Sequence, residues 1–190
     1  MLEQQLSQAT FQIPNKFILS LEASIFRDSL HDFVRESWHI VEPDVPFVDG
    51  WHIHAICNYL EAVYENRLGD LIINVPPRHM KSLLVDVFFP AWVWTKSPSK
   101  KFICLSYAES TITEHTKKCK KLIKSEWYQT HFNVALEITP DTDTKFANRN
   151  GGFVYSFGFG GAYTGGGADF LLIDDPLKAA AADSDAERNK

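Results

Sequence analysis

Two short segments of this chain carry residue types and spacings suited to phosphate chemistry, and the first runs from Asn74 to Ser82. It follows a short apolar run and places Lys81 and Ser82 at the expected start of a helix. A helix N-terminus offers unpaired N–H groups and the positive end of a dipole to an anion. A lysine there can reach the terminal phosphates of a nucleotide, and a hydroxyl beside it can bind Mg²⁺. The segment therefore predicts a phosphate loop for ATP and Mg²⁺.

This loop departs from the usual glycine-rich pattern. Counted back from Lys81, the two usual glycine positions hold Val75 and Met80. Glycine lets a backbone approach phosphate and adopt positive φ, a geometry that is more costly for Met80. The alternative interpretation is a Pro-Pro turn whose lysine and serine simply begin a helix. Arg78 is a further cation that could face a phosphate from inside the loop.

The second segment is the acidic end of an apolar run, where Phe170–Ile173 leads into Asp174 and Asp175. In phosphate-loop ATPases one such carboxylate holds Mg²⁺ and the next polarises the attacking water. Side chains at the carboxyl ends of parallel strands converge on the crevice where ligands bind. The alternative interpretation is that the two aspartates and Pro176 cap a following helix. The order of the two segments, with a strand and a helix between them, favours nucleotide hydrolysis.

Strands and helices alternate along the chain, so we expect an α/β fold with a largely parallel central sheet flanked on both faces by helices. Apolar periodicity and turn residues place the boundaries. The expected helices are 16–40, one from Asp49 as its cap to about Arg67, one from Lys81 that bends or ends near Pro90, and Glu109–Ser125. The expected strands are Leu71–Val75, Lys101–Tyr107, Lys145–Asn148, Gly152–Phe159 and Phe170–Ile173, with a hairpin turn at Asn150–Gly151.

The composition is that of one compact globular domain. The chain has 190 residues, of which 45% are hydrophobic and 23% charged, close to globular averages. Three cysteines without CxxC spacing favour a reducing cytoplasm. No apolar stretch reaches the length that crosses a membrane, so we expect no membrane partner. A net charge of −5 means that any contact with DNA must come from a local patch, another domain or an assembly.

Several motifs in combination resemble the large subunit of the phage terminases, the DNA-packaging ATPase–nucleases. The resemblance covers most of the chain from about Phe33 onward. The similar stretches are Trp51-His52 before a helix, Ile73-Asn-Val-Pro-Pro-Arg78-His-Met-Lys81-Ser82, Phe89-Pro-Ala-Trp92, Leu105-Ser-Tyr-Ala108, Thr164-Gly-Gly-Gly-Ala-Asp169 and Ile173-Asp-Asp-Pro176. The resemblance implies an ASCE-type P-loop NTPase fold, with residues 1–48 as an N-terminal helical extension and 49–190 as the ATPase core.

The resemblance also implies roles for individual residues. Lys81 would act on the phosphates together with Arg78, which matches the family's loop arginine. Asp175 would take the place of the catalytic glutamate, and Ser82 and Asp174 would hold Mg²⁺. The residues expected around the nucleotide are Pro77, Arg78, His79, Met80, Lys81, Ser82 and Leu83 at the phosphates, with Trp51 and His52 near the adenine.

Further features depart from the family's pattern. Asp175 is one methylene shorter than glutamate, so positioning of the water requires an adjusted site. Many relatives carry an arginine that reaches into a neighbouring subunit where this chain has Thr164, and Arg149 is then the nearest candidate for such a role. The family's C-terminal nuclease domain, of RNase-H-like fold, is expected to be absent from these 190 residues.

The activity implied by the resemblance is hydrolysis of MgATP to drive double-stranded DNA into a procapsid. The implied partners are double-stranded DNA, the portal protein, a small terminase subunit and further copies of the chain in a ring on the portal. The implied location is the cytoplasm of the infected bacterial host, not the mature virion. Two alternatives stay open: a helicase-like DNA translocase, and a catalytically weakened module that binds nucleotide or DNA.

Three further patterns have a structural and a functional interpretation. His52 and His54 are two residues apart and do not share a helix face, so the sequence predicts no metal site among the histidines. The basic run Lys117–Lys124 is expected to be a solvated helix face in preference to a DNA contact. The alternating aromatic residues of Phe153–Phe159 predict a strand whose aromatic side faces the core.

Overall fold

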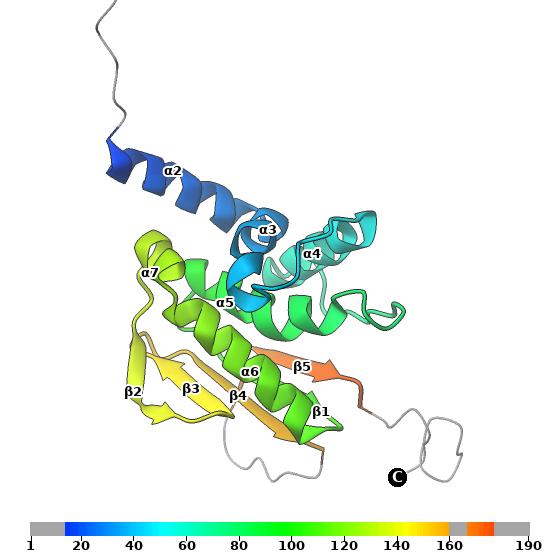
Figure 1. The fold of residues 1–190 in the computed structure, drawn as a ribbon. Coiled ribbons are helices and arrows are strands. Elements are labelled where there is room, and N and C mark those ends of the chain that lie inside the picture. Colours follow the sequence, from blue (N-terminus) through cyan, green and yellow to red (C-terminus); the bar gives the residue numbers. More distant parts are fainter. Residues whose placement is uncertain (1–13, 160–166, 177–190) are drawn as a thin grey trace, which may run out of the picture.

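The computed structural model describes residues 14–159 and 167–176, which form an α/β arrangement (Figure 1). The helical elements are α2 (Asn15–Asp28), α3 (Leu30–Val41), α4 (Trp51–Tyr64), the π-helix η2 (Leu83–Phe88), α5 (Phe89–Lys96), α6 (Glu109–Lys124) and α7 (Glu126–Phe132). The strands are β1 (Phe102–Ser106), β2 (Leu136–Asp141), β3 (Lys145–Asn148), β4 (Phe153–Gly158) and β5 (Phe170–Asp174). Helix α6 and four of these strands lie where the sequence predicted them.

The five strands form one mixed sheet in the order β2-β3-β4-β1-β5. Strand β1 is parallel to both of its neighbours, β4 and β5, whereas β2, β3 and β4 pair antiparallel. The expected α/β class is confirmed, but the expectation of a largely parallel sheet is wrong. The reason is local: the turn at Asn150 and Gly151, with φ of 86° at Gly151, reverses the chain and makes β3 and β4 a hairpin.

The helices that touch the sheet lie on one of its faces, where α6 crosses β1 and β4 (Figure 1). Ser156 of β4 points to that face, because its Oγ accepts a hydrogen bond from the Thr116 hydroxyl of α6 at 2.7 Å. The half-buried side chains of Phe153, Tyr155 and Phe157 therefore lie on the opposite face. The expectation that these aromatic residues face the core is wrong, since the smaller residues between them pack under α6. Within the described ranges no helix covers the aromatic face, so the expectation of helices on both faces of the sheet is wrong for this part of the chain.

Residues Lys81 to Lys96 form one continuous helix in the middle of the core. Its first part is the π-helix η2, in which the N–H of Phe89 donates to the carbonyl of Leu84, and α5 continues past Pro90. A proline inside an α-helix lacks a donor and clashes with the carbonyl four residues earlier. The wider π-helical turn directly before Pro90 relieves this conflict. The expected disturbance at this proline is therefore a change of helix type and not an end of the helix.

The segment Leu71–Val75 is not a strand of the sheet, so the expectation of a buried strand there is wrong. Its alternate side chains, Leu71, Ile73 and Val75, are half-buried against the core, whereas Ile72 between them is 93% exposed. A period of two is that of an extended chain. None of the described strands pairs with this segment. Its alternating pattern indicates an extended chain but does not indicate which strand it would pair with.

The N-terminal region forms two helices where the sequence predicted one. The backbone is extended at Ser29, with φ of −130° and ψ of 115°, and this separates α2 from α3. The Ser29 hydroxyl accepts a hydrogen bond from the N–H of Asp32 at 3.1 Å and so caps α3. Helix α4 begins after Gly50, not with Asp49 as its cap, and ends at Tyr64, somewhat earlier than expected.

One hydrophobic core joins the N-terminal helices to the sheet. Trp92 of α5 is fully buried, and its indole N–H donates to the carbonyl of Phe26 in α2 at 2.9 Å. The buried Tyr128 hydroxyl of α7 donates to the carbonyl of Ala91 at 2.7 Å. Hydrogen bonds of buried polar groups therefore fix α5 against two other helices. No helix in the described part of the chain is long and apolar enough to cross a membrane.

Replacing Gly152 with alanine is expected to lower the free energy of unfolding by at least about 2 kcal/mol. A Cβ at this position would lie 2.2 Å from the carbonyl oxygen of Pro98 and 2.8 Å from that of Lys100, where the hairpin packs beside the start of β1. Urea unfolding measures the change. Gly69→Ala is the matched control, because a Cβ there meets no atom within 4 Å. Equal losses in the two variants would contradict the close packing at Gly152.

Candidate phosphate-binding site

The structure brings the lysine of the predicted phosphate loop to the acidic end of β5. Lys81 Nζ lies 3.0 Å from Oδ1 of the buried Asp174 and 2.6 Å from Oδ1 of the exposed Asp175. Partial burial lowers the pKa of Lys81, but its hydrogen bonds to Asp175 and Asp174 outweigh this and raise the pKa above its ordinary value. Lys81 is therefore charged in this contact. Ser82 and Leu83 follow it into the buried helix.

Three non-glycine residues around this contact have a left-handed backbone. The φ angle is 66° at Arg78, 64° at Met80 and 43° at Asp175. Each such conformation costs roughly 1–3 kcal/mol, and strain of this kind concentrates at binding and catalytic sites. Met80 occupies a position where the sequence pattern usually has glycine, and it adopts the positive φ that glycine would adopt without strain. The exposed Arg78 lies two residues before it in the same loop.

The left-handed residue after β5 also explains how two consecutive carboxylates reach one lysine. In a regular strand, the side chains of Asp174 and Asp175 would point to opposite faces of the sheet. The positive φ of Asp175 breaks this alternation, and both carboxylates contact Lys81. The backbone is held there by the N–H of Tyr107, which donates to the carbonyl of Asp175 at 3.2 Å.

The Pro-Pro turn of the loop is held by the ring of His79. Its Nδ1–H donates to the carbonyls of Pro76 and Pro77 at 3.0 and 2.9 Å. The ring of His52, in α4, meets the His79 ring edge-on at a centroid distance of 5.3 Å. Trp51 precedes it and is largely exposed. Of the two residues predicted to lie near the adenine, His52 thus contacts the predicted phosphate loop, and Trp51 is its neighbour in the chain.

The candidate for a trans-acting arginine lies away from this contact. Arg149 is in the β3–β4 hairpin, whose Asn148 side chain donates to the carbonyl of Pro98 just before β1. Asp174 pairs with the last residue of β1, at the other end of that strand. Arg149 therefore lies at the other end of β1 from Asp174 of its own chain. Thr164, at the position the resemblance singled out, lies outside the described residues.

A buried acid–imidazole pair beside Asp174 was not predicted. Asp86 of η2 is fully buried, and its Oδ2 lies 3.1 Å from Nδ1 of His115 in α6. Burial raises the pKa of the Asp86 carboxyl to about 6, and the hydrogen bond from His115 offsets only part of this effect. Its Oδ1 has no hydrogen-bond partner among the described residues. The feature of the sequence that could have indicated this pair is a single aspartate within the apolar run Leu83–Phe88.

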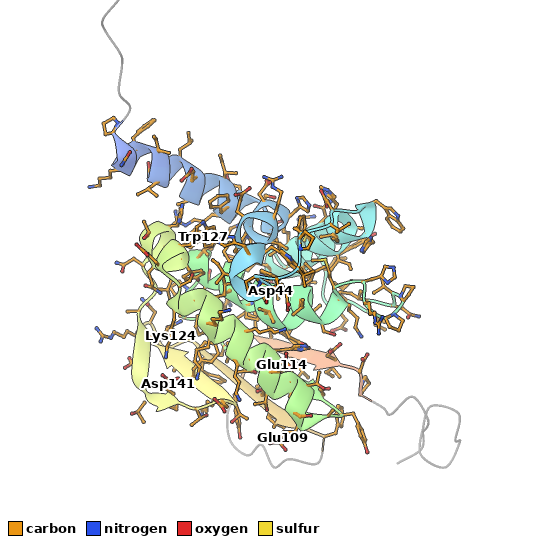
Figure 2. All side chains as sticks on the ribbon, viewed as in Figure 1. Asp44, Glu109, Glu114, Lys124, Trp127 and Asp141 are labelled. Carbon is orange, nitrogen blue, oxygen red and sulfur yellow. The ribbon has the colours of Figure 1, made fainter. Side chains whose placement is uncertain are left out.

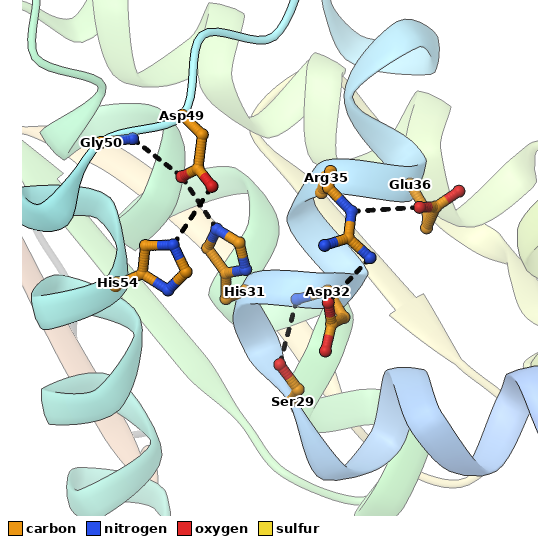
Figure 3. Close-up of polar contacts among 8 residues, drawn as sticks. All are labelled: Ser29, His31, Asp32, Arg35, Glu36, Asp49, Gly50 and His54. Atoms are coloured by element: carbon orange, nitrogen blue, oxygen red, sulfur yellow. Dashed lines mark hydrogen bonds and ion pairs between the residues drawn. The ribbon is translucent and has the colours of Figure 1, made fainter.

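Another cluster joins α3, α4 and the loop between them (Figure 3). Asp49 Oδ1 lies 3.0 Å from Nε2 of His31, and Asp49 Oδ2 lies 3.1 Å from Nε2 of His54. The two imidazole rings stack at a centroid distance of 3.6 Å. Chiefly through the hydrogen bond from His31, the pKa of Asp49 falls to about 2. The sequence comparison of His52 with His54 missed this cluster because His54 meets a histidine of another helix.

The lysine-rich face of α6 is paired with acidic residues of the same chain, and Figure 2 shows Asp141 beside Lys124 at the end of the helix. Lys118 Nζ lies 2.6 Å from Glu42, and Lys120 and Lys124 each lie 2.7 Å from the carboxylate of Asp141. Of these lysines only Lys124 is half exposed, whereas Lys118 and Lys120 are partly buried, and the pairs reduce the positive charge offered to a DNA phosphate. Lys117, Lys121 and Lys124 are exposed on this face, and its interpretation as a solvated face in preference to a DNA contact stays a prediction.

Replacing Asp49 with asparagine is expected to lower the free energy of unfolding near neutral pH. The loss caused by the substitution is expected to become smaller as the pH falls. The folded-state pKa of Asp49 is about 2 against an ordinary 3.8. Its carboxylate therefore contributes stability above about pH 4, and the contribution disappears as the pH falls through about 2. Urea unfolding of both proteins from about pH 6 downward measures the difference, and a difference that does not change with pH would contradict the prediction.

Comparisons with known proteins add no family assignment to this geometry. No protein-family model matches the chain, and no curated protein or solved structure is found to be similar. The functional interpretation therefore rests on the residues of the loop and of the acidic strand end, and on the contact between them.

Proposed function

We propose that this chain is an ATP-hydrolysing domain of the P-loop class. The contact of Lys81 with Asp174 and Asp175 is the observation that carries the proposal. The sequence motifs predict that the lysine acts on phosphates and that the aspartates act on the metal ion and the attacking water. Neither alternative interpretation, a Pro-Pro turn at a helix start or an aspartate helix cap, requires these distant segments to meet. Nucleotide hydrolysis does require it.

The residues at this contact fit a magnesium–nucleotide complex. Lys81 supplies a positive charge for the terminal phosphates, and the Ser82 hydroxyl and Asp174 carboxylate supply the oxygen ligands that Mg²⁺ prefers. Mg²⁺ bound there would neutralise charge on the phosphate oxygens. The exposed Trp51 and the half-buried His52, whose ring meets that of His79 in the loop, offer flat surfaces to the base.

Each residue of the site has a role that follows from its chemistry. Lys81 leaves the two carboxylates and binds the terminal phosphates, and Arg78 adds a second positive charge from the loop. Asp175 is exposed, so its carboxylate oxygen can accept a hydrogen bond from the attacking water and orient it. The left-handed backbone at Asp175 directs this short side chain toward Lys81 and in this way replaces the longer reach of glutamate.

The motifs shared with phage terminase large subunits extend the proposal to DNA packaging. In this role, hydrolysis of MgATP would drive double-stranded DNA into a procapsid. The proposed partners are the DNA, the portal protein, a small terminase subunit and other copies of the chain in a ring. In such a ring the exposed hairpin carrying Arg149 is the candidate to reach a neighbour's nucleotide. The proposed location is the cytoplasm of an infected bacterial host.

Lys81→Ala is expected to weaken binding of MgATP at least about tenfold, because it removes the charge that faces the phosphates. Calorimetry with a non-hydrolysable MgATP analogue measures the change in affinity.

Asp175→Asn is expected to preserve binding of MgATP and to lower its turnover by roughly 10²-fold or more, because the amide orients water less well. Phosphate release by the wild type and by Asp175→Asn, with DNA and portal protein present, measures the change in turnover.

Lys100→Ala is the matched control for Lys81→Ala. Lys100 Nζ lies 2.8 Å from Asp169 Oδ1, so this variant also breaks a Lys–Asp pair, at the opposite end of β5. It should leave binding and turnover unchanged. Equal affinity of the wild type and Lys81→Ala for the analogue would show that the site assignment is wrong. Tight binding by the wild type without turnover in the assembled motor would instead identify a nucleotide-binding module.

A further inference from the structure

Three side chains from three different elements converge on the inner side of the candidate site. Asp86 comes from η2, His115 from α6 and Asp174 from the end of β5. Each offers one oxygen or nitrogen atom, and these atoms all lie within 4.8 Å of one another. The side chains of Asp86, His115 and Asp174 are 1%, 12% and 5% exposed, so water screens their charges poorly.

The fold by itself gives no reason to bury Asp86. Its Oδ2 has only His115 as a partner, and its Oδ1 has none among the residues that the structure describes. A buried carboxylate with an unsatisfied oxygen is destabilising, and the nearby carboxylate of Asp174 adds repulsion. An apolar residue in the same place would avoid both costs. A bound cation would satisfy the free oxygen and remove the repulsion between the two aspartates.

We propose that Asp86, His115 and Asp174 bind one divalent transition-metal ion, of the Zn²⁺ or Mn²⁺ class, beside the phosphate loop. Two carboxylates with one imidazole suit these ions, whereas Mg²⁺ prefers oxygen ligands alone. Bonds of about 2.0–2.2 Å place the ligands of a tetrahedral ion roughly 3.3–3.6 Å apart. Atoms already within 4.8 Å of one another reach that arrangement through small side-chain rotations.

The cluster of His31, Asp49 and His54 is a weaker candidate for the same chemistry. Its two imidazole rings are stacked with an interplanar angle of 20°. The lone pairs of a histidine lie in the plane of its ring, so the lone pairs of stacked rings are nearly parallel and do not converge on one ion. Both oxygens of Asp49 already accept hydrogen bonds, and half of the His54 side chain is exposed.

Lys81 lies beside one ligand of the proposed metal site, and its charge is expected to affect how tightly an ion binds. Its ammonium group lies 3.0 Å from Asp174 Oδ1 and therefore competes with a metal ion for that carboxylate. Removal of the lysine charge without loss of its bulk, as in Lys81→Met, should tighten metal binding. A purely structural role of the Asp86–His115 pair would produce no such gain.

Metal binding is measured on the full chain without nucleotide, by calorimetry with Zn²⁺ and by the visible absorption of bound Co²⁺. The wild type is expected to bind one ion per chain. Asp86→Asn, which keeps the shape of the side chain, and His115→Ala are each expected to weaken Zn²⁺ binding at least about tenfold and to abolish the Co²⁺ absorption. Circular dichroism checks that both variants keep the helix content of the wild type.

His131→Ala is the matched control, because His131 also pairs with a carboxylate, that of Glu22 at 3.3 Å, but lies outside the cluster. It should bind Zn²⁺ as tightly as the wild type. If Asp86→Asn and His115→Ala retain wild-type affinity, or if only His54→Ala loses it, the proposal is wrong. The test does not use ATP. If the chain binds Zn²⁺ through Asp86 but does not bind MgATP, the metal site is supported and the proposed ATPase function is contradicted.

Discussion

Burial of the helix from Lys81 to Lys96 is the constraint on which the rest of the structure depends. Leu84, Phe88, Trp92 and Trp94 are fully buried on it, and each large apolar side chain contributes roughly 1.5–3 kcal/mol when removed from water. Helices on one side and the sheet on the other close around these residues. Because the helix begins at Lys81, the packing of its apolar residues also determines where the lysine lies. The core therefore positions the charge at the site.

The backbone around Lys81 is strained, and the packing of the core holds it in that conformation. Arg78 and Met80 before the helix and Asp175 after β5 each adopt a conformation that favours glycine. The surrounding core and the hydrogen bonds of His79 hold the loop in this form. A loop without glycine is consequently more rigid than a glycine-rich one, since its residues have fewer accessible conformations to exchange between.

The π-helical segment η2 connects two features that would otherwise be unrelated. It lets the helix continue through Pro90, and it carries Asp86 into the core beside His115 and Asp174. π-helical turns are less stable than α-helical ones and occur frequently at functional sites. The proline accounts for the π-helical turn, whereas an apolar residue in place of Asp86 would suit the core better, so it is the buried carboxylate that carries the proposal of a bound ion.

The sequence by itself determined the elements whose signals are local. The strands at 102–106 and 170–174, the helix at 109–124 and the Asn150–Gly151 hairpin follow from periodicity and turn chemistry. The residue types of the loop lysine and the strand-end aspartates, their places at a helix start and a strand end, and the order of the two segments predict that they serve one site.

Only the tertiary structure decided which elements meet. The extended run 71–75 has the period of a strand but pairs with none that is described, and the aromatic side of β4 faces away from α6. Asp86 with His115, and His31 with His54, come from different helices. Such contacts depend on how whole helices and strands pack around the core, and a local pattern of residues does not encode that packing.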